Sequence, residues 1–343
     1  MENRFYPLLF EPNLHPVVWG GDQIERWKGL PDSGRPIGES WEVSAVPSSL
    51  SIVANGAYRG KDLAAVIAAH PVEVLGKHVA AEYDNQLPLL VKFIDARRDL
   101  SIQVHPDDEM AAREHGKRGK TEMWYVIDAQ PGAFLYDGFT LAMPQGSREE
   151  AAAEYKRRIA DGTITEVLAR HEVHAGDVFY LPAGRVHAIC SGILLAEVQQ
   201  SSDVTYRIFD YNRPGMDGKP RELHTELAAR ALNYQVEKEY RTAYDYREGC
   251  ANVVVDSPFF NVRVADVQGE LHRDLLAADS FVIAMCMRGN CRIRVCRTGE
   301  EVQLREGFST LIPAATADYD LIADNKDGRS QVLEAYIDGS KHA

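Results

Sequence analysis

A short internal repeat links two distant segments of this 343-residue chain and limits how it can fold. The sequence AGDVFYLPAGRVH, at positions 175–187, aligns without a gap with EGFSTLIPAATAD at positions 306–318. In both segments a glycine precedes a short apolar run, and a proline follows that glycine by six residues. A glycine turn followed by a strand that ends at proline is a local β pattern. Further short runs of this kind, frequent after Ala251, favour an all-β barrel or sandwich over a parallel α/β sheet.

The first copy of the repeat ends in His187 and the second in Asp318. A glycine turn, a strand ending in proline and then a histidine resemble the second characteristic motif of the cupin superfamily. This resemblance implies a mainly β chain with two cupin-like (jelly-roll) β-barrels and a few flanking helices. We expect residues 1–240 to form a catalytic, metal-binding cupin domain with helical insertions, and residues 241–343 to form a second, degenerate cupin-like β domain. Because an aspartate replaces the histidine, we expect no metal in the second barrel.

The helical signals are confined to a few segments. Residues 60–83 are rich in helix formers and are divided by Pro71, which cannot continue a helix. Residues 147–161 start with Ser147, a good N-cap, and place acids early and bases late. The charged segment 221–238 is predicted to be a helical connector.

The formal net charge of −13 argues against nucleic acid or an anionic membrane as the main partner. An anionic small substrate remains compatible, because a few lysines can dominate the field of a cleft. No run is long and apolar enough to cross a bilayer, and the opening MENR is not typical of a secretory signal. Five cysteines, three of them at five-residue steps (Cys286, Cys291 and Cys296), match neither a zinc-finger spacing nor a disulfide framework. We therefore expect reduced thiols and a cytoplasmic protein. As for its oligomeric state, we expect a monomer or a weak homodimer.

The segment 100–108 (LSIQVHPDD) carries an unusual row of polar side chains. Read as a β-strand, it points Ser101, Gln103 and His105 to one face and apolar residues to the other. Glutamine and histidine can both be metal ligands, through Oε1 and a ring nitrogen. The alternative explanation is the solvent-facing edge of a half-buried strand.

Two further strands carry residues of the same chemistry. Glu122 lies in KTEMWYVID, and His187 ends the first copy of the repeat. Together with Gln103 and His105 they offer two imidazoles, a carboxylate and an amide oxygen. Such a set suits Zn²⁺ with water and would accept Fe²⁺, Mn²⁺ or Co²⁺. Taken singly, Glu122 could be a surface carboxylate and His187 a core histidine, but barrel strands would bring all four residues inward.

Six motifs follow one another in the order typical of one enzyme family. They are GESWEV, LPLLVKFIDA, SIQVHPDD, GKTEMWYVI, LPAGRVHAI and SSDVTYRIFDYNR. These motifs resemble type I mannose-6-phosphate isomerases, and the resemblance runs from Phe5 to roughly Glu226. The chain lacks the large helical insertion of the longer members and is similar to the short bacterial form.

The resemblance implies a set of site residues. The family's zinc ligands, for one ion per chain, fall on Gln103, His105, Glu122 and His187. Polar pocket positions that would bind substrate fall on Lys92, Ser101 and Lys120. The active-site arginine of the family falls on Arg207, and an acid of the family pattern falls on Glu197.

The resemblance also implies a reaction, a zinc-dependent aldose–ketose isomerisation of mannose 6-phosphate and fructose 6-phosphate through a cis-enediol(ate). A metal ion near the two reacting oxygens would stabilise the developing oxyanion. The catalytic set would be Arg207, Glu197 and Lys120. Arg207 keeps its charge and can hold an oxyanion or the phosphate, while Lys92 and Lys120 give a local positive field. Glu197 is a candidate for the base at C2, or for a partner that orients a metal-bound histidine. The structural alternative for Arg207 is an ion pair with Glu197 or Asp203.

Two other functions are compatible with a metal-binding cupin barrel. A metal-dependent cupin oxygenase would need an iron facial triad with open positions, and Gln103 as a ligand fits that less well. A non-catalytic sugar-binding protein would need neither Arg207 nor a complete ligand set.

Overall fold

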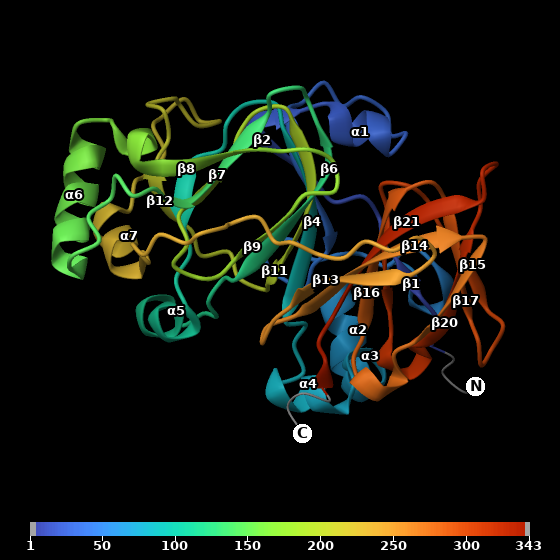
Figure 1. Cartoon of the computed structure of the whole chain (residues 1–343). Coiled ribbons are helices and arrows are strands. Elements are labelled where there is room, and N and C mark those ends of the chain that lie inside the picture. The colour runs from blue at the N-terminus through green and yellow to red at the C-terminus, as the bar shows by residue number, and fades with distance from the viewer. Residues whose placement is uncertain (1–4, 340–343) are drawn as a thin grey trace.

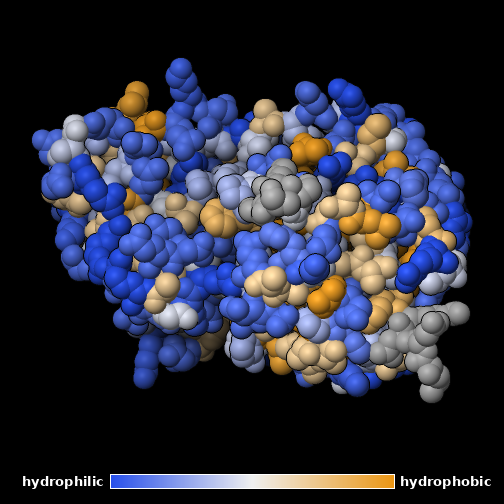
Figure 2. Space-filling view, turned by 90° about the horizontal axis from the view of Figure 1, so that it is seen from below, coloured by the Kyte–Doolittle hydropathy of each residue, from blue (hydrophilic) through white to orange (hydrophobic). Residues whose placement is uncertain are grey.

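The computed structural model describes residues 5–339 (Figure 1). Residues 1–4 and 340–343 lie outside the described residues, and they include the opening MENR and the outer ends of the two predicted domains. Within the described part of the chain, no helix is long and apolar enough to cross a membrane. On the face shown in Figure 2, hydrophilic residues dominate and hydrophobic residues are scattered among them.

Two antiparallel sheets form the first barrel (Figure 1). One sheet has the order β2-β3-β4-β11-β6-β9. Its strands are β2 (Leu14–Gly21), β3 (Ile37–Val43), β4 (Leu89–Ala96), β11 (Ile193–Gln200), β6 (Glu122–Ala129) and β9 (Val178–Leu181). The facing sheet has the order β12-β5-β10-β7-β8. Its strands are β12 (Tyr206–Phe209), β5 (Ile102–Val104), β10 (His187–Ile189), β7 (Phe134–Phe139) and β8 (Leu168–Glu172).

Two further antiparallel sheets form the second barrel. The larger one contains β1 (Leu8–Leu9), β19 (Ser309–Ile312), β16 (Val282–Arg288), β21 (Arg329–Tyr336), β14 (Asn261–Gln268) and β13 (Ala251–Asp256). The smaller one contains β15 (Glu270–Asp274), β20 (Asp318–Ala323), β17 (Cys291–Val295) and β18 (Glu301–Leu304). β1 comes from the start of the chain but pairs with β19, so this strand belongs to a sheet of the second barrel. The predicted mainly β fold with two barrels is confirmed.

The helices are short and flank the barrels (Figure 1). They are α1 (Gln23–Trp27), α2 (Leu63–Ala69), α3 (Pro71–Leu75), α4 (Lys77–Glu82), α5 (Asp108–His115), α6 (Arg148–Ala160) and α7 (Thr225–Ala231), with 3₁₀ turns η1 (Gly56–Tyr58), η2 (Ile164–Val167), η3 (Leu276–Ala278) and η4 (Ala314–Thr316).

Two of the helix predictions are confirmed in their details. Pro71 separates α2 from α3 and stands at the first position of α3, where its missing N–H costs nothing. Ser147 caps α6 and forms a capping box with Glu150. The predicted helix over 221–238 is wrong outside α7. Beyond α7 the chain bonds to the first barrel instead, since the Asn233 N–H donates to the Gly184 carbonyl at 2.8 Å.

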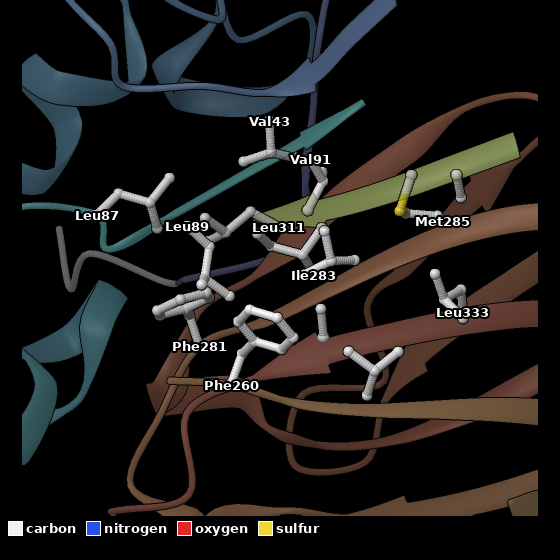
Figure 3. Close-up of a cluster of buried hydrophobic side chains, with 14 of the residues drawn as sticks. Val43, Leu87, Leu89, Val91, Phe260, Phe281, Ile283, Met285, Leu311 and Leu333 are labelled. Atoms are coloured by element: carbon white, nitrogen blue, oxygen red, sulfur yellow. The ribbon is translucent and has the colours of Figure 1, made fainter. Parts of the chain in front are cut away.

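The two barrels share one hydrophobic core (Figure 3). Val43 and Val91 come from β3 and β4 of the first barrel. Ile283, Leu311 and Leu333 come from β16, β19 and β21 of the second barrel. All five side chains are fully buried, so apolar side chains of the two barrels pack directly against each other.

Candidate metal centre and active site

Strand pairing in the first barrel aligns four polar residues across one sheet. Arg207 on β12 lies opposite Gln103 on β5, and Gln103 lies opposite His187 on β10. His187 in turn lies opposite Asp137 on β7. Directly paired residues of antiparallel strands point to the same face of the sheet. All four side chains therefore project from one face.

The facing sheet of the same barrel carries a second row. Lys92 on β4 pairs with Trp41 on β3 and with Glu197 on β11, and Glu197 pairs with Trp124 on β6. The Trp124 indole meets the His187 imidazole edge to face, with 5.3 Å between the ring centres. This contact places the two rows opposite each other inside the barrel.

Three of the predicted metal ligands meet between the rows. One ligand atom each of His105, Glu122 and His187 lies within 4.8 Å of the other two. Nε2 of His105 is 3.3 Å from Glu122 Oε2, and Nε2 of His187 is 3.3 Å from Glu122 Oε1. A tetrahedral ion with ligands at about 2.0–2.1 Å separates its ligand atoms by about 3.3–3.4 Å. The observed spacing therefore fits an ion of that kind.

Hydrogen bonds to backbone carbonyls orient the two histidines so that each Nε2 faces the cluster. Nδ1 of His105 donates to the Val204 carbonyl at 3.0 Å, and Nδ1 of His187 donates to the Arg185 carbonyl at 2.9 Å. Because a carbonyl can only accept, each Nδ1 carries the proton and each neutral ring presents a lone pair at Nε2. Such a bond from the second ring nitrogen is typical of metal-binding histidines.

Burial and charge keep the cluster in the protonation state that a metal needs. Burial lowers the pKa of His105 to about 4, and nearby Lys120 acts in the same direction. Burial also lowers the pKa of His187. For Glu122, burial raises the pKa, but Lys120 and the two imidazoles outweigh it and hold that pKa well below its usual range. At neutral pH the cluster is two neutral imidazoles and one carboxylate.

The donors that face this cluster are few. Lys120 Nζ lies 2.8 Å from Glu122 Oε2 and 3.1 Å from His105 Nε2. Glu122 Oε1 accepts no hydrogen bond from any residue in 5–339, although it is buried. Buried acceptors without donors are costly unless a cation is present. The donor set therefore fits a metal ion.

Gln103 lies beside the cluster, at a partly exposed position. Its Nε2 is 3.3 Å from His187 Nε2. The oxygen and nitrogen of an amide occupy nearly equivalent positions, so a turn of the amide would place Oε1 there instead. Gln103 is therefore within reach of the position of a fourth ligand.

Lys92 and Glu197 are joined in a buried charge network. Lys92 Nζ is 3.3 Å from Glu197 Oε1 and 3.7 Å from Glu39 Oε2, and it lies 4.9 Å above the centre of the Trp41 ring. Burial lowers the pKa of Lys92, but Glu39 and Glu197 outweigh burial and raise it. Trp124 Nε1 donates to Glu197 Oε2 at 3.0 Å, so the Glu197 carboxylate is held from both sides.

Arg207 and Ser101 complete the predicted set. Arg207 Nη1 donates to the Glu222 carbonyl at 3.0 Å, while its buried Nε has no partner among the described residues. The expected structural partners of Arg207 are engaged elsewhere, Glu197 with Lys92 and Asp203 with Lys117. Ser101 is buried, 4% exposed, and lies just before β5.

The sequence alone missed several residues of the site. Asp137 and Arg185 form a buried ion pair at 3.1 Å next to His187, and burial raises the pKa of Asp137 to about 7. Trp41 and Glu39 stand beside Lys92. The alternation of residues along its strand could have indicated that Trp41 faces the site. The position of Asp137 could not be inferred in this way, because it depends on which strand pairs with β7.

The second barrel holds another group of possible ligands, which are His272, Cys296 and Asp318. This group differs from the first in burial, because the His272 side chain is 60% exposed. Asp320, next to it, is paired with Arg294 at 2.7 Å. Burial and the neighbouring acids raise the pKa of the Cys296 thiol to about 11. The group is therefore less suited to hold an ion than the buried cluster.

The fold and the site together define a class: two-barrel β proteins with a buried histidine–glutamate cluster that could hold a metal ion and that has lysine and arginine beside it. Comparison with known proteins makes this more specific. The family model of the phosphomannose isomerase type I catalytic domain matches residues 9–128. A mannose-6-phosphate isomerase from Streptococcus mutans is 34% identical over 308 residues, which cover 90% of this chain and 92% of that protein.

Solved structures agree with this relationship. The mannose 6-phosphate isomerase of Bacillus subtilis superposes with a TM-score of 0.84 at 31% identity, over 96% of this chain and 99% of that one. A putative mannosephosphate isomerase from Archaeoglobus fulgidus superposes with a TM-score of 0.76 at 25% identity, over 98% and 99%. This chain belongs to the mannose-6-phosphate isomerase family. It is an isomerase, and the oxygenase and non-catalytic alternatives are set aside.

Proposed function

We propose that this chain interconverts mannose 6-phosphate and fructose 6-phosphate with one zinc ion per chain. The observation that carries the proposal is the buried cluster of His105, Glu122 and His187 at the spacing of a tetrahedral ion. The names of the Streptococcus mutans and Bacillus subtilis relatives support the choice of substrate. We also assign catalysis to residues 1–240 and a structural role to residues 241–343, since all residues of the proposed site precede position 240.

His105, Glu122 and His187 would hold the ion, with Gln103 as a fourth ligand. Two imidazoles, a carboxylate and an amide oxygen suit Zn²⁺. When bound, the ion would supply Lewis acidity beside the oxygens on C1 and C2 of the sugar, which are the carbonyl and hydroxyl oxygens that the reaction interchanges. The neutral rings and the ionised carboxylate described above need no proton release before binding.

The cations around the cluster favour a phosphorylated sugar. Lys92 and Lys120 are buried, and Arg207 projects from the sheet that carries His187. Because Lys92 and Lys120 each face a carboxylate, Arg207 and a bound divalent ion would supply the net positive charge that attracts the phosphate. The planar guanidinium of Arg207 can donate two parallel hydrogen bonds to a phosphate or to an enediolate oxygen.

The isomerisation moves one proton between C1 and C2 through a cis-enediolate. Glu197 is our candidate for the base, because its buried carboxylate is held in one orientation by Trp124 and Lys92. Lys120 lies 2.8 Å from Glu122 and can donate to a substrate oxygen close to the cluster. Arg207 stabilises negative charge that appears only in the enediolate, which lowers the barrier to proton transfer.

A coupled assay that detects the conversion of mannose 6-phosphate to fructose 6-phosphate by the enzyme tests this function. The untreated enzyme should turn over, a chelator should abolish turnover, and zinc should restore it. Parallel additions of Fe²⁺, Mn²⁺ and Co²⁺ test the choice of metal. Full activity after metal has been removed to below the enzyme concentration would contradict the proposal.

A further inference from the structure

A cleft runs between the two barrels, away from the metal cluster. It consists of two adjoining cavities of about 560 and 550 Å³ that share Tyr246, Arg288, Glu306 and Gln331 in their walls. Tyr125 of β6 lines the first cavity. Successive residues of a strand point to opposite faces, so Tyr125 and Trp124 lie on opposite sides of β6. The cleft is therefore separated from the active site by the sheet that contains β6.

Four aromatic side chains line the first cavity, and hydrogen bonds between the barrels hold two of them in place. Tyr125 of the first barrel donates to Gln331 Oε1 of β21 at 3.2 Å. Trp27 Nε1 donates to Glu306 Oε1, also in the second barrel, at 2.8 Å. Fixed ring faces are suitable surfaces for the flat face of a sugar or a base. The aromatic residues of the cleft are Trp27, Tyr125, Tyr244 and Tyr246.

The charges of the cleft leave cations without partners. Glu306 is satisfied by Trp27 Nε1 and by the Gly289 N–H at 2.7 Å. Asp266 accepts from the Gly249 N–H at 2.7 Å. The side chains of Arg288 and Lys326, in contrast, make no ion pair or hydrogen bond with the residues that the structure describes. Arg288, which lines both cavities, therefore offers an anion donors that no described residue occupies. The cleft also contains four carboxylates, each of which accepts a hydrogen bond from a neutral donor and keeps its charge: Asp128, Asp266, Glu306 and Asp327.

We propose that this cleft binds a small organic phosphate that contains a ring, either a hexose phosphate or a mononucleotide. The ring packs against the tyrosines and Trp27, and the phosphate pairs with Arg288, whose planar donors match phosphate oxygens. Because the walls come from both barrels, a bound ligand stabilises their packing and raises the melting temperature of the protein.

Binding measurements on three proteins test this site: the wild type, Arg288→Gln, and the control Arg59→Gln. Arg59 is exposed, lines neither cavity of the cleft, and loses the same charge in the control. The probes are glucose 6-phosphate and adenosine monophosphate, with glucose and inorganic phosphate as partial ligands. We expect at least one of the two ring phosphates to bind the wild type and the control equally. In Arg288→Gln its Kd should rise by about tenfold or more, as for loss of a charge-assisted hydrogen bond.

The two ring phosphates also separate the possible sources of the ligand, because a preference for one identifies the ring that the aromatic wall accepts. Arg288→Lys keeps the positive charge but lacks the planar pair of donors of the guanidinium, so its affinity for the ring phosphate should lie between those of Arg288→Gln and the wild type. The isomerase kcat/KM, measured without added probe, should be equal in all variants. Equal binding to Arg288→Gln and Arg59→Gln would place the ligand elsewhere and overturn the proposal. So would the absence of binding by both ring phosphates up to about ten millimolar.

Discussion

Arg207 differs from Lys92 and Lys120, the other cations of the proposed active site, because it has no carboxylate partner. Lys92 pairs with Glu197, and Lys120 pairs with Glu122. None of the ion pairs within residues 5–339 includes Arg207, and its buried Nε is unsatisfied. A buried guanidinium nitrogen without an acceptor is costly, which favours a functional role for this half-buried side chain over a structural one.

Arg207→Ala should therefore lower kcat by about two orders of magnitude or more, as for loss of an oxyanion donor. Metal content and melting temperature should change little, because no buried carboxylate is left unpaired. Arg207→Lys should rescue poorly, since a point charge lacks the planar fork. The exposed Arg35→Ala is the matched control. A loss of several kcal/mol in stability, with normal turnover of the folded fraction, would instead assign Arg207 a structural role.

The neutral histidines of the cluster make the metal-free protein sensitive to acid. An unfolded histidine titrates near pH 6.5, whereas burial lowers the pKa of His105 to about 4. The unfolded state therefore binds more protons as the pH falls from 6.5 toward 4. Stability present at neutral pH should be lost over this range, by up to about 3 kcal/mol from His105.

Urea unfolding of the chelated enzyme between pH 7 and pH 4 measures this effect. His105→Gln should make the dependence shallower, because glutamine does not titrate. The account of the buried histidines would be wrong if the variant and the parent lost stability with the same slope.

Alternation and motif spacing were enough to select His105, Glu122 and His187, which the structure brings together. They could not place Asp137 beside His187, because that neighbour depends on the pairing of β7 with β10. They also could not show that Asp203 pairs with Lys117, because the two exposed residues are distant in sequence and only the folded structure brings them together.

At the scale of elements, the two copies of the internal repeat have the same local fold but different ends. β9 and β19 are both strands of four residues that stop before a proline. The first copy continues to β10, which starts at His187, and the second to β20, which starts at Asp318. The repeat therefore correctly predicted equivalent strands in the two barrels. The two copies differ at their last residue, which is the buried His187 in the first copy and the half-exposed Asp318 in the second.

This difference predicts one tightly bound ion per chain. Elemental analysis of the wild type and of Asp318→Asn should give the same metal content, since the His272 group is exposed and the Cys296 thiol is protonated at neutral pH. A second ion that survives the loss of His187 would contradict the prediction.

The helix prediction over 221–238 failed for a physical reason that also belongs to this scale. The charged composition of the segment favoured a helical connector, but backbone hydrogen bonds to the first barrel were available beyond α7. Such tertiary hydrogen bonds compete with helix formation and are invisible in a single segment.

At the scale of the whole molecule, a buried ion pair of the first barrel lies where the two barrels meet. Lys28 Nζ lies 2.6 Å from Glu42 Oε1, and the side chains are 1% and 5% exposed. Ser309 of the second barrel donates to Glu42 Oε2 at 3.0 Å. The Lys28 ammonium also lies over the rings of Phe93 and Phe308, one from each barrel.

Glu42→Gln should lower the free energy of unfolding by about 3–5 kcal/mol, because Lys28 would be left buried without a partner. Thermal unfolding and denaturant titration measure this, with the exposed Glu73→Gln as control. Equal stability of the two variants would show that the pair does not hold the barrels together.

We propose that the buried cluster of His105, Glu122 and His187 holds the metal on which isomerisation depends. The most direct test measures metal content by elemental analysis, together with turnover of mannose 6-phosphate, in His187→Ala. The exposed His174→Ala is measured beside it as the matched control. We predict that the control keeps one ion per chain and full turnover. The His187 variant should lose the ion, and its turnover should fall by about two orders of magnitude or more. A His187→Ala protein that still holds one ion per chain and turns over normally would contradict the account.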